Sequence, residues 1–202
     1  QAIAQTSRFE DYTEQQVEWS GMLYKCPNVT LDYQLVPLDV YTPLDMRAPG
    51  GTIGVYALEC ALDELAYAAN IDPVELRQKN FTDFNANEGK PYSSKALLEC
   101  YEQGAERFGW SKRTMAPRSM QDGHQLIGWG MATGMWEAMQ MPASAKACID
   151  VTGKLIVSSA TTDIGTGTYT VMTQIAAEAM GFPMDQVEFK LGDSNMAKAP
   201  LQ

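Results

Sequence analysis

The chain has 202 residues, of which 45% are hydrophobic and 20% charged, and its formal net charge is −10. This composition is ordinary for a globular protein of one or two domains with a substantial core. The negative charge argues against an extended nucleic-acid-binding face, because no stripe of Lys and Arg is present to neutralise phosphates. No apolar run reaches the roughly 20 residues that a membrane-spanning helix requires.

Cysteine and histidine are too sparse to suggest a metal centre or a catalytic pair. Cys26, Cys60, Cys100 and Cys148 are far apart and form no CxxC pair, so neither a zinc site nor an iron–sulfur cluster is encoded locally. We expect them to be buried free thiols, with a disulfide as the alternative. The only histidine, His124, follows an Asp-Gly pair and is expected in an exposed turn. Serine–histidine and cysteine–histidine catalysis are therefore excluded, since the base is missing.

The first half of the chain predicts a strand followed by helices. Residues 27–38 alternate apolar and polar side chains, as a strand does. A loop of sequence M-R-A-P-G-G, residues 46–51, then leads into a helix over residues 53–69. Its acidic side chains, among them Glu59 and Asp63, are expected on solvated faces. Its apolar positions recur at spacings of three and four and predict a buried stripe of Val55, Leu58, Leu62, Leu65 and Ala69.

Two further helices follow in this half. Asp72 is expected to cap the second helix, which begins with Pro73 at its first helical position. Ser93 or Ser94 is expected to cap the third helix, and Gly109 is expected to end it.

The second half of the chain predicts mainly strands. Residues 110–123 are basic and contain proline, which is typical of a linker. After it we expect, in order, a glycine-spaced strand, a hairpin, a helix and a last strand: residues 126–139, 143–151 with 154–161, 168–180 and 186–191. This order indicates an α+β fold of layered strands and helices, divided into segments 1–109 and 124–202.

A glycine–threonine loop precedes the helix of the second half. Residues 160–170 read A-T-T-D-I-G-T-G-T-Y-T. A Gly-x-Gly turn before a helix leaves backbone N–H groups unpaired and lets a ligand approach the main chain closely. Thr166, Thr168 and Thr170 add hydroxyl groups. The loop is a candidate site for phosphate or another anionic group, and the alternative is a plain turn. It lacks the lysine of a P-loop and the GxGxxG spacing of a dinucleotide fold.

Five motifs carry a family resemblance when they are taken in order. They are M-R-A-P-G, D-P-V-E-L-R-Q-K-N, G-W-G-M-A, T-D-I-G-T-G-T-Y-T and L-G-D-S. Together they closely resemble the molybdenum-binding large subunit of the xanthine dehydrogenase/aldehyde oxidoreductase family, above all the branch with separate large, medium and small subunits. The resemblance covers about residues 8–200. It implies an internal fragment of such a subunit, whose α+β layers are part of the molybdopterin-binding domains of a molybdenum hydroxylase.

The resemblance assigns cofactor contacts to the M-R-A-P-G loop. Arg47 matches the family arginine that lies beside the pterin dithiolene and the molybdenum oxo ligands. A guanidinium suits that place, because it offers a rigid fork of donors to anionic oxygen or sulfur. Ala48 and Gly50 shape the same loop by resemblance. The alternative for Arg47 is an ordinary surface or salt-bridging arginine.

Further contacts are assigned to the second half. Gly165, Thr166 and Gly167 match the loop that wraps the pterin phosphate or the pyrophosphate of a dinucleotide form, and the residues from Thr168 to Thr170 adjoin it at the helix start. A second loop of the same binding half is matched by Asp193 and Ser194. No residue of the chain is assigned as a metal ligand.

The resemblance also implies a reaction and a set of partners. The parent would oxidise an aldehyde or an N-heterocycle with oxygen from water, using a molybdenum–molybdopterin cofactor, plain or in the cytosine dinucleotide form. Iron–sulfur and FAD centres would be carried by partner subunits, in a soluble bacterial enzyme of the cytoplasm or periplasm. The family's general-base glutamate is expected beyond the C-terminus, so no catalytic residue is assigned here. Gln15 stands about where some relatives have a substrate-orienting arginine, which weakens a purine substrate.

A second hypothesis does not involve catalysis. A free-standing domain of this fold would act as an inactive binding or assembly module. Truncation of a core shared with missing segments would expose apolar surface, so self-association of the chain is expected in either case.

Overall fold

The structure is a computed structural model that describes residues 14, 16–36, 39, 46–137 and 139–200. The chain divides into two compact units, residues 1–137 and residues 138–202. Each unit has its own cluster of buried apolar side chains. The predicted linker, residues 110–123, lies inside the first unit. The division into segments 1–109 and 124–202 stays a prediction.

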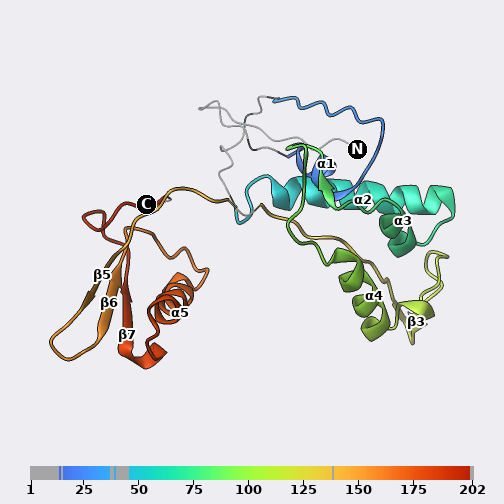
Figure 1. The fold of residues 1–202 in the computed structure, drawn as a ribbon. Helices are drawn as coiled ribbons and strands as arrows, with labels where there is room; N and C mark the ends of the chain where they lie inside the picture. The colour runs from blue at the N-terminus through green and yellow to red at the C-terminus, as the bar shows by residue number, and fades with distance from the viewer. Residues whose placement is uncertain (1–13, 15, 37–38, 40–45, 138, 201–202) are drawn as a thin grey trace. The chain divides into compact units, whose positions relative to one another are not determined.

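The first unit is built around one long helix, α2 (Gly51–Ala69), which packs against the short helices α1 (Trp19–Leu23) and α3 (Pro73–Lys79). Figure 1 shows these three helices together, with α4 (Leu97–Phe108) farther along the chain. The remaining elements are two short hairpins and a turn of 3-10 helix: β1 (Phe84–Asn85) with β2 (Lys90–Pro91), β3 (Gln121–Asp122) with β4 (Gln125–Leu126), and Trp110–Lys112. The buried cluster consists of Trp19, Met22, Leu23, Tyr24 and Val55.

The predicted start of α3 and the predicted end of α4 are confirmed, but the predicted serine cap of α4 is wrong. The Asp72 carboxylate accepts hydrogen bonds from the backbone N–H groups of Val74 (2.8 Å) and Glu75 (3.3 Å), so it caps α3. Gly109, with φ of 80°, ends α4 in the left-handed conformation. Neither predicted serine caps α4, because the helix starts at residue 97 with Ala96 before it. A side-chain cap must reach the second or third N–H of its helix, and residues 93 and 94 lie too far upstream.

Two predicted strands are absent from the described residues. Residues 27–36 pair with no neighbouring strand, and all of them are exposed except the half-buried Tyr33. Residues 127–137 are also irregular, and the only strand pairing near them is the short β3–β4 hairpin. The alternating pattern of apolar and polar residues gave a wrong strand prediction in both cases, because a strand needs a neighbour to take its backbone hydrogen bonds. In the second segment, side chains take some of these bonds: Arg113 donates to the carbonyl of Trp129 (3.0 Å).

Helix α2 buries only part of the predicted stripe: Val55, Leu58 and Leu62 belong to or pack against the buried cluster, whereas the end of the stripe is exposed. Val55 and Ala66 are buried, but Leu65 is 50% exposed and Ala69 is exposed as well. Glu59, expected in solvent, is only 3% exposed. Glu59 is buried because the face of α2 that contains it meets a buried arginine on α3, described below.

The second unit is a three-stranded sheet covered by one helix. Its strands β5 (Lys146–Ile149), β6 (Leu155–Ser158) and β7 (Val187–Lys190) lie in the order β5-β6-β7. The β5–β6 hairpin is antiparallel, whereas β6 and β7 are parallel and are connected through α5 (Thr168–Met180) and the 3-10 turn Met184–Gln186. Figure 1 shows α5 beside the sheet. The predicted hairpin, helix and last strand are confirmed. The buried cluster consists of Leu155, Val157, Ala176, Ala177, Val187 and Phe189.

Candidate functional site

The M-R-A-P-G loop forms a tight turn at the start of α2. Ala48 (φ 55°) and Gly50 (φ 71°) both have left-handed backbone conformations, which allow the chain to reverse before the helix. The Thr52 hydroxyl donates to the carbonyl of Arg47 (2.6 Å), and its N–H donates to the carbonyl of Ala48 (3.1 Å). The side chain of Arg47 is exposed, and within the described part of the chain its guanidinium has no ion-pair partner. The turn therefore holds Arg47 in place through its backbone and leaves its donors available.

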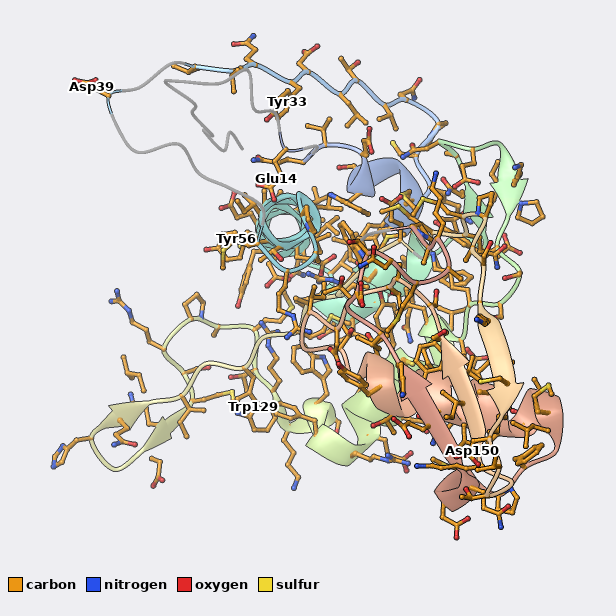
Figure 2. The ribbon with its side chains drawn as sticks, turned by 90° about the vertical axis from the view of Figure 1, so that its left-hand side faces the viewer. Glu14, Tyr33, Asp39, Tyr56, Trp129 and Asp150 are labelled. Carbon is orange, nitrogen blue, oxygen red and sulfur yellow. The ribbon has the colours of Figure 1, made fainter. Side chains whose placement is uncertain are left out.

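A carboxylate already lies at the amino end of this helix. Glu14, which is buried, accepts a hydrogen bond from the backbone N–H of Gly50 (2.5 Å). Figure 2 shows Glu14 beside the end of α2, with Tyr33 near it. Burial, followed by the charge of Glu14, raises the pKa of Tyr33. Because Glu14 neutralises the partial positive charge of the helix start, an anion near this loop would rely on Arg47 rather than on the helix.

A cleft of about 740 Å³ opens along α2 beside this loop. One wall is formed by α2, and the other by the glycine-spaced segment of residues 130–135. Ala48 and Gly51 lie at the end near the loop, and Tyr56, which is 68% exposed, projects from α2 in Figure 2. Gly130, Met131 and Ala132 of the G-W-G-M-A motif line this cleft, whereas the residue that adjoins the start of α2 is Met135, whose carbonyl oxygen lies 3.2 Å from a Cβ atom placed on Gly51.

A buried polar network lies behind this cleft, and sequence reasoning missed it. The Glu59 carboxylate accepts hydrogen bonds from Arg77 Nε (2.7 Å), from the Tyr24 hydroxyl (2.6 Å) and from the backbone N–H of Thr133 (2.9 Å). The hydroxyls of Thr133 and Tyr101 are 2.6 Å apart. The network thereby joins α2, α3, α4 and the glycine-spaced segment. Its only signal in the sequence was the arginine of D-P-V-E-L-R-Q-K-N, which is completely buried.

The ionisation of the network follows from its burial. Burial by itself lowers the pKa of Arg77, but the negative charge and hydrogen bond of Glu59 outweigh it, so the pKa of Arg77 lies above its ordinary value. Burial, followed by the hydrogen bond to Glu59, raises the pKa of Tyr24. Arg77 is thus a cation and Tyr24 a neutral donor at neutral pH. These groups fix the positions of helices and lie away from the M-R-A-P-G loop, so we assign them a structural role.

The glycine–threonine loop follows the carboxyl end of β6 and leads into α5. Gly165 (φ 93°) and Gly167 (φ 78°) have left-handed conformations, and a Cβ atom at either position would meet nothing within 4 Å. The loop is therefore open on the side where these glycines lie. The first backbone N–H groups of α5, from Thr168 to Thr170, have no acceptor within the helix because they belong to its first turn. The hydroxyls of Thr166 and Thr168 are 3.0 Å apart.

Asp163 takes up part of the donor capacity of this loop. One of its carboxylate oxygens accepts from the N–H groups of Gly165 (2.8 Å) and Thr166 (3.1 Å). The hydrogen bond from Gly165, helped by other N–H groups of the loop, lowers the pKa of Asp163. Because Asp163 also draws on the N–H of Tyr169 in the first turn of α5, an anionic ligand would meet chiefly the threonine hydroxyls, while Asp163 keeps the loop in shape.

The second predicted loop lies at the same end of the sheet. Asp193 and Ser194 follow β7, and the N–H of Gly192 donates to the carbonyl of Thr161 (2.9 Å). The N–H of Ala160 donates to the carbonyl of Ala197 (2.8 Å). Because β6 and β7 are parallel, their carboxyl ends meet at one edge, where ligands bind in open α/β sheets.

The structure thus places the predicted site residues in two groups. Arg47, Ala48 and Gly50 form one loop of the first unit. The others gather at one end of the sheet of the second unit: Gly165, Thr166, Gly167, Thr168, Thr170, Asp193 and Ser194. Gln15 lies outside the described residues.

The prediction for the histidine is confirmed, whereas the prediction for the cysteines is wrong. His124 is exposed in the β3–β4 turn, as predicted. The cysteines are free, but Cys26, Cys100 and Cys148 are exposed and Cys60 is half-buried, so the expectation of buried thiols is wrong. They lie on turns, edges and outer helix faces, where no apolar layer covers them. Among the described residues, no group of His, Cys, Asp and Glu is arranged to hold a metal ion.

Comparison with known proteins defines the class. Two models of the molybdopterin cofactor-binding domain match the chain, one over residues 5–81 and the other over residues 103–200. The chain therefore belongs to the molybdopterin cofactor-binding domain family. Within the described ranges, no helix is both long and apolar enough to cross a membrane.

Particular relatives are molybdenum-binding subunits. The aldehyde oxidoreductase molybdenum-binding subunit PaoC of Escherichia coli O157:H7 is 40% identical over 183 residues, which are 90% of this chain and 25% of that protein. The xanthine dehydrogenase molybdenum-binding subunit of the same organism is 37% identical over 150 residues, 70% of this chain and 20% of that one. The chain thus spans about a quarter of the length of these relatives.

Solved structures agree on the fold. Quinoline 2-oxidoreductase from Pseudomonas putida 86 matches 76% of this chain and 22% of its own, with a TM-score of 0.52 and 20% identity. The Cu,Mo-CO dehydrogenase matches 73% of this chain and 21% of its own, with a TM-score of 0.51 and 22% identity. Both confirm the expected mixed fold of helices and strands.

Proposed function

We propose that the chain is part of the catalytic subunit of a molybdenum hydroxylase and that three of its loops, those at Arg47, at Gly165–Thr170 and at Asp193, help to bind the pterin cofactor. The observation that carries this proposal is the meeting of two loops at the carboxyl ends of β6 and β7, beside the start of α5. The sequence similarity to the molybdenum-binding subunits of an aldehyde oxidoreductase and a xanthine dehydrogenase supports it. The substrate class is an aldehyde or an N-heterocycle.

The donors of the second unit fit an anionic group such as a phosphate. The open side of Gly165 and Gly167 admits a ligand to the main chain. The hydroxyls of Thr166, Thr168 and Thr170 donate to its oxygens. Asp193 and Ser194 border the same end of the sheet. The extra phosphate and nucleoside of a cytosine dinucleotide form would use the same donors.

The exposed guanidinium of Arg47 fits a second anionic part of the cofactor. Its turn is held by the backbone bonds to Thr52, while Ala48 and Gly50 set the path of the chain. When bound, the molybdenum centre supplies the two-electron oxidation of the substrate with oxygen taken from water. The role of this chain is to hold and orient that group. The proton-accepting glutamate, the iron–sulfur clusters and the flavin would come from other segments or from partner subunits.

The test measures cofactor content in the intact molybdenum-binding subunit. Arg47→Ala and Thr168→Val each remove a donor to an anionic group, and we expect either to weaken cofactor retention about tenfold or more. Thr173→Val is the matched control, because the Thr173 hydroxyl donates to the carbonyl of Tyr169 within α5 (2.7 Å). Molybdenum and pterin are measured per subunit by metal analysis and by fluorescence of the oxidised pterin.

The outcomes separate the hypotheses. Loss of molybdenum and pterin in Arg47→Ala and Thr168→Val, with normal content in Thr173→Val, supports the proposal. Normal cofactor content and turnover in Arg47→Ala would refute the role of that residue. A wild-type subunit that contains neither molybdenum nor pterin, and binds no added pterin, would refute the proposal as a whole.

A further inference from the structure

Within the part of the chain that the structure describes, strand β5 is an unprotected edge of the sheet in the second unit. It pairs with β6 on one side, and all four of its residues are exposed. Natural edge strands usually carry proline, several charges or a bulge, because a free edge can pair with another chain. The sequence Lys-Ala-Cys-Ile has none of these except one lysine. Ile149, 58% exposed, is a large apolar side chain on this edge.

The direction of the backbone groups of β5 follows from its pairing with β6. Asp150 donates its N–H to the carbonyl of Lys154 (2.9 Å), so the even-numbered residues turn their hydrogen-bonding groups towards β6. The N–H and C=O groups of Ala147 and Ile149 therefore point away from the sheet. These are the groups that an added strand would bond.

The faces of β5 are equally well defined. Ala147 lies opposite Val157 and Ile149 lies opposite Leu155, so both share the face that carries the buried core. Lys146 and Cys148 share the other face, because side chains alternate along a strand. Within the described ranges, Lys146 has no ion-pair partner. Asp150, on the hairpin end labelled in Figure 2, uses one oxygen for Thr152 and Lys154.

We propose that β5 pairs antiparallel with β5 of a second copy of the chain, about a two-fold axis at Cys148, giving one six-stranded sheet. In this register Ala147 bonds Ile149 of the second copy, so the outward backbone groups are satisfied in both directions. The two apolar side chains continue the core face. Lys146 lies opposite Asp150 of the second copy, and the symmetry makes this opposite-charge pair twice. The two Cys148 residues face one another.

Other registers would satisfy the backbone hydrogen bonds between the two β5 strands, but they would not place opposite charges across from each other. With Ala147 opposite itself, Lys146 would lie opposite Cys148. With Ile149 opposite itself, Cys148 would lie opposite Asp150. Only the register centred on Cys148 pairs opposite charges, and cross-strand charge pairs select register in antiparallel sheets. It also makes Cys148 a non-hydrogen-bonded pair, with Cα atoms about 4.5 Å apart, a distance at which two cysteines can be joined.

The first test is the oligomeric state of the 202-residue chain in reducing buffer. Sedimentation velocity over a wide range of concentrations should show a species of twice the 22.2 kDa chain mass. Lys146→Glu replaces two attractive pairs by repulsive ones and should weaken dimerisation about tenfold or more. Lys90→Glu makes the same charge change on exposed β2 of the first unit and should leave dimerisation unchanged. Circular dichroism checks that both variants fold.

The second test is the register. Diamide takes up the two electrons and two protons released when two thiols form a disulfide. It should cross-link the wild-type chain into a covalent dimer, and Cys148→Ser should abolish the product. Cys26→Ser and Cys100→Ser remove other exposed thiols and should keep it. A monomer at every concentration, equal effects of Lys90→Glu and Lys146→Glu, or a cross-link that survives Cys148→Ser would overturn the proposal. None of these readouts depends on cofactor binding.

Discussion

Glu59 and Arg77 show how a single pair of residues can organise the first unit. Arg77 is fully buried, and an isolated cation there would cost far more than a domain's net stability. Its Nε–H donates to the Glu59 carboxylate at 2.7 Å, its other nitrogens donate to the backbone carbonyls of Pro73 and Glu59, and Nη2 forms an ion pair with Asp63 at 2.9 Å. Because both carboxylate oxygens of Glu59 also have donors, the charge of each partner is compensated.

We expect Glu59→Gln to destabilise the first unit by about 3 kcal/mol, since the variant leaves a buried arginine without its main counter-charge. The amide also offers one acceptor where the carboxylate offered two. Urea unfolding followed by circular dichroism measures the change. Glu64→Gln, an exposed position on the same helix, is the control and should change stability by less than about 0.5 kcal/mol. A similar, small effect of both substitutions would show that the pair contributes nothing.

At the scale of elements, one glycine, Gly54, allows two segments of the first unit to approach each other closely. Gly54 lies in α2 where the chain before α1 crosses it. A Cβ atom there would lie 1.9 Å from the carbonyl oxygen of Gln16 and 2.8 Å from the ring of Trp19. The crossing therefore depends on the missing side chain. Gly104, in the middle of α4, has nothing within 4 Å of its Cβ position.

These two glycines should respond in opposite directions to the same substitution. Gly54→Ala forces backbone apart and should destabilise the first unit by about 1–3 kcal/mol or more. Gly104→Ala removes a flexible residue from an open helix face and should stabilise by about 0.5–1 kcal/mol. Thermal unfolding of both variants provides the measurement. A loss of stability in Gly104→Ala comparable to that in Gly54→Ala would contradict the packing described here.

Exposed apolar side chains and thiols are prominent when the molecule is taken as a whole. Val151, Ile164 and Met46 are 105%, 79% and 69% exposed. Together with the open edge of β5, they are the reason to expect self-association of the chain. That expectation stays a prediction until the oligomeric state is measured.

The thiols give a direct check on this exposure. At concentrations low enough to keep the chain monomeric in non-denaturing buffer, Cys26, Cys100 and Cys148 should react rapidly with a thiol reagent such as Ellman's, and half-buried Cys60 should react more slowly. Single cysteine-to-serine variants assign each phase. Unfolding in guanidinium should make all four equivalent. Fewer than three rapid thiols in the native chain would mean that part of this surface is covered.

Much of the second unit was predictable because its signals are local. The turn around Thr152-Gly153, the span of α5 and the position of β7 each follow from residues close together in the chain. The caps at Asp72 and Gly109 were readable for the same reason. The family could be recognised because its motifs are short and occur in a fixed order.

Strand pairing beyond the hairpin, and the burial of charged residues, depend on distant partners and could not be predicted. The segments 27–36 and 127–137 have strand-like patterns, but the described chain gives them no neighbouring strand. The carboxylate of Glu59 was assigned to solvent because its partners are distant: Arg77 lies 18 residues away, Tyr24 lies 35 and Thr133 lies 74. Helical periodicity carries no information about such contacts.

The amino-acid sequence by itself therefore determined the family, most of the helices and the three loops that are candidates for cofactor binding. Only the tertiary structure decided that β6 and β7 run parallel, and with this that the loops at Gly165–Thr170 and at Asp193 lie at one end of a sheet. It also decided that β5 is left as an open edge. The physical reason is that turns, caps and helices use hydrogen bonds between neighbours in the chain, whereas sheet order and buried charge pairs use partners that only folding brings together.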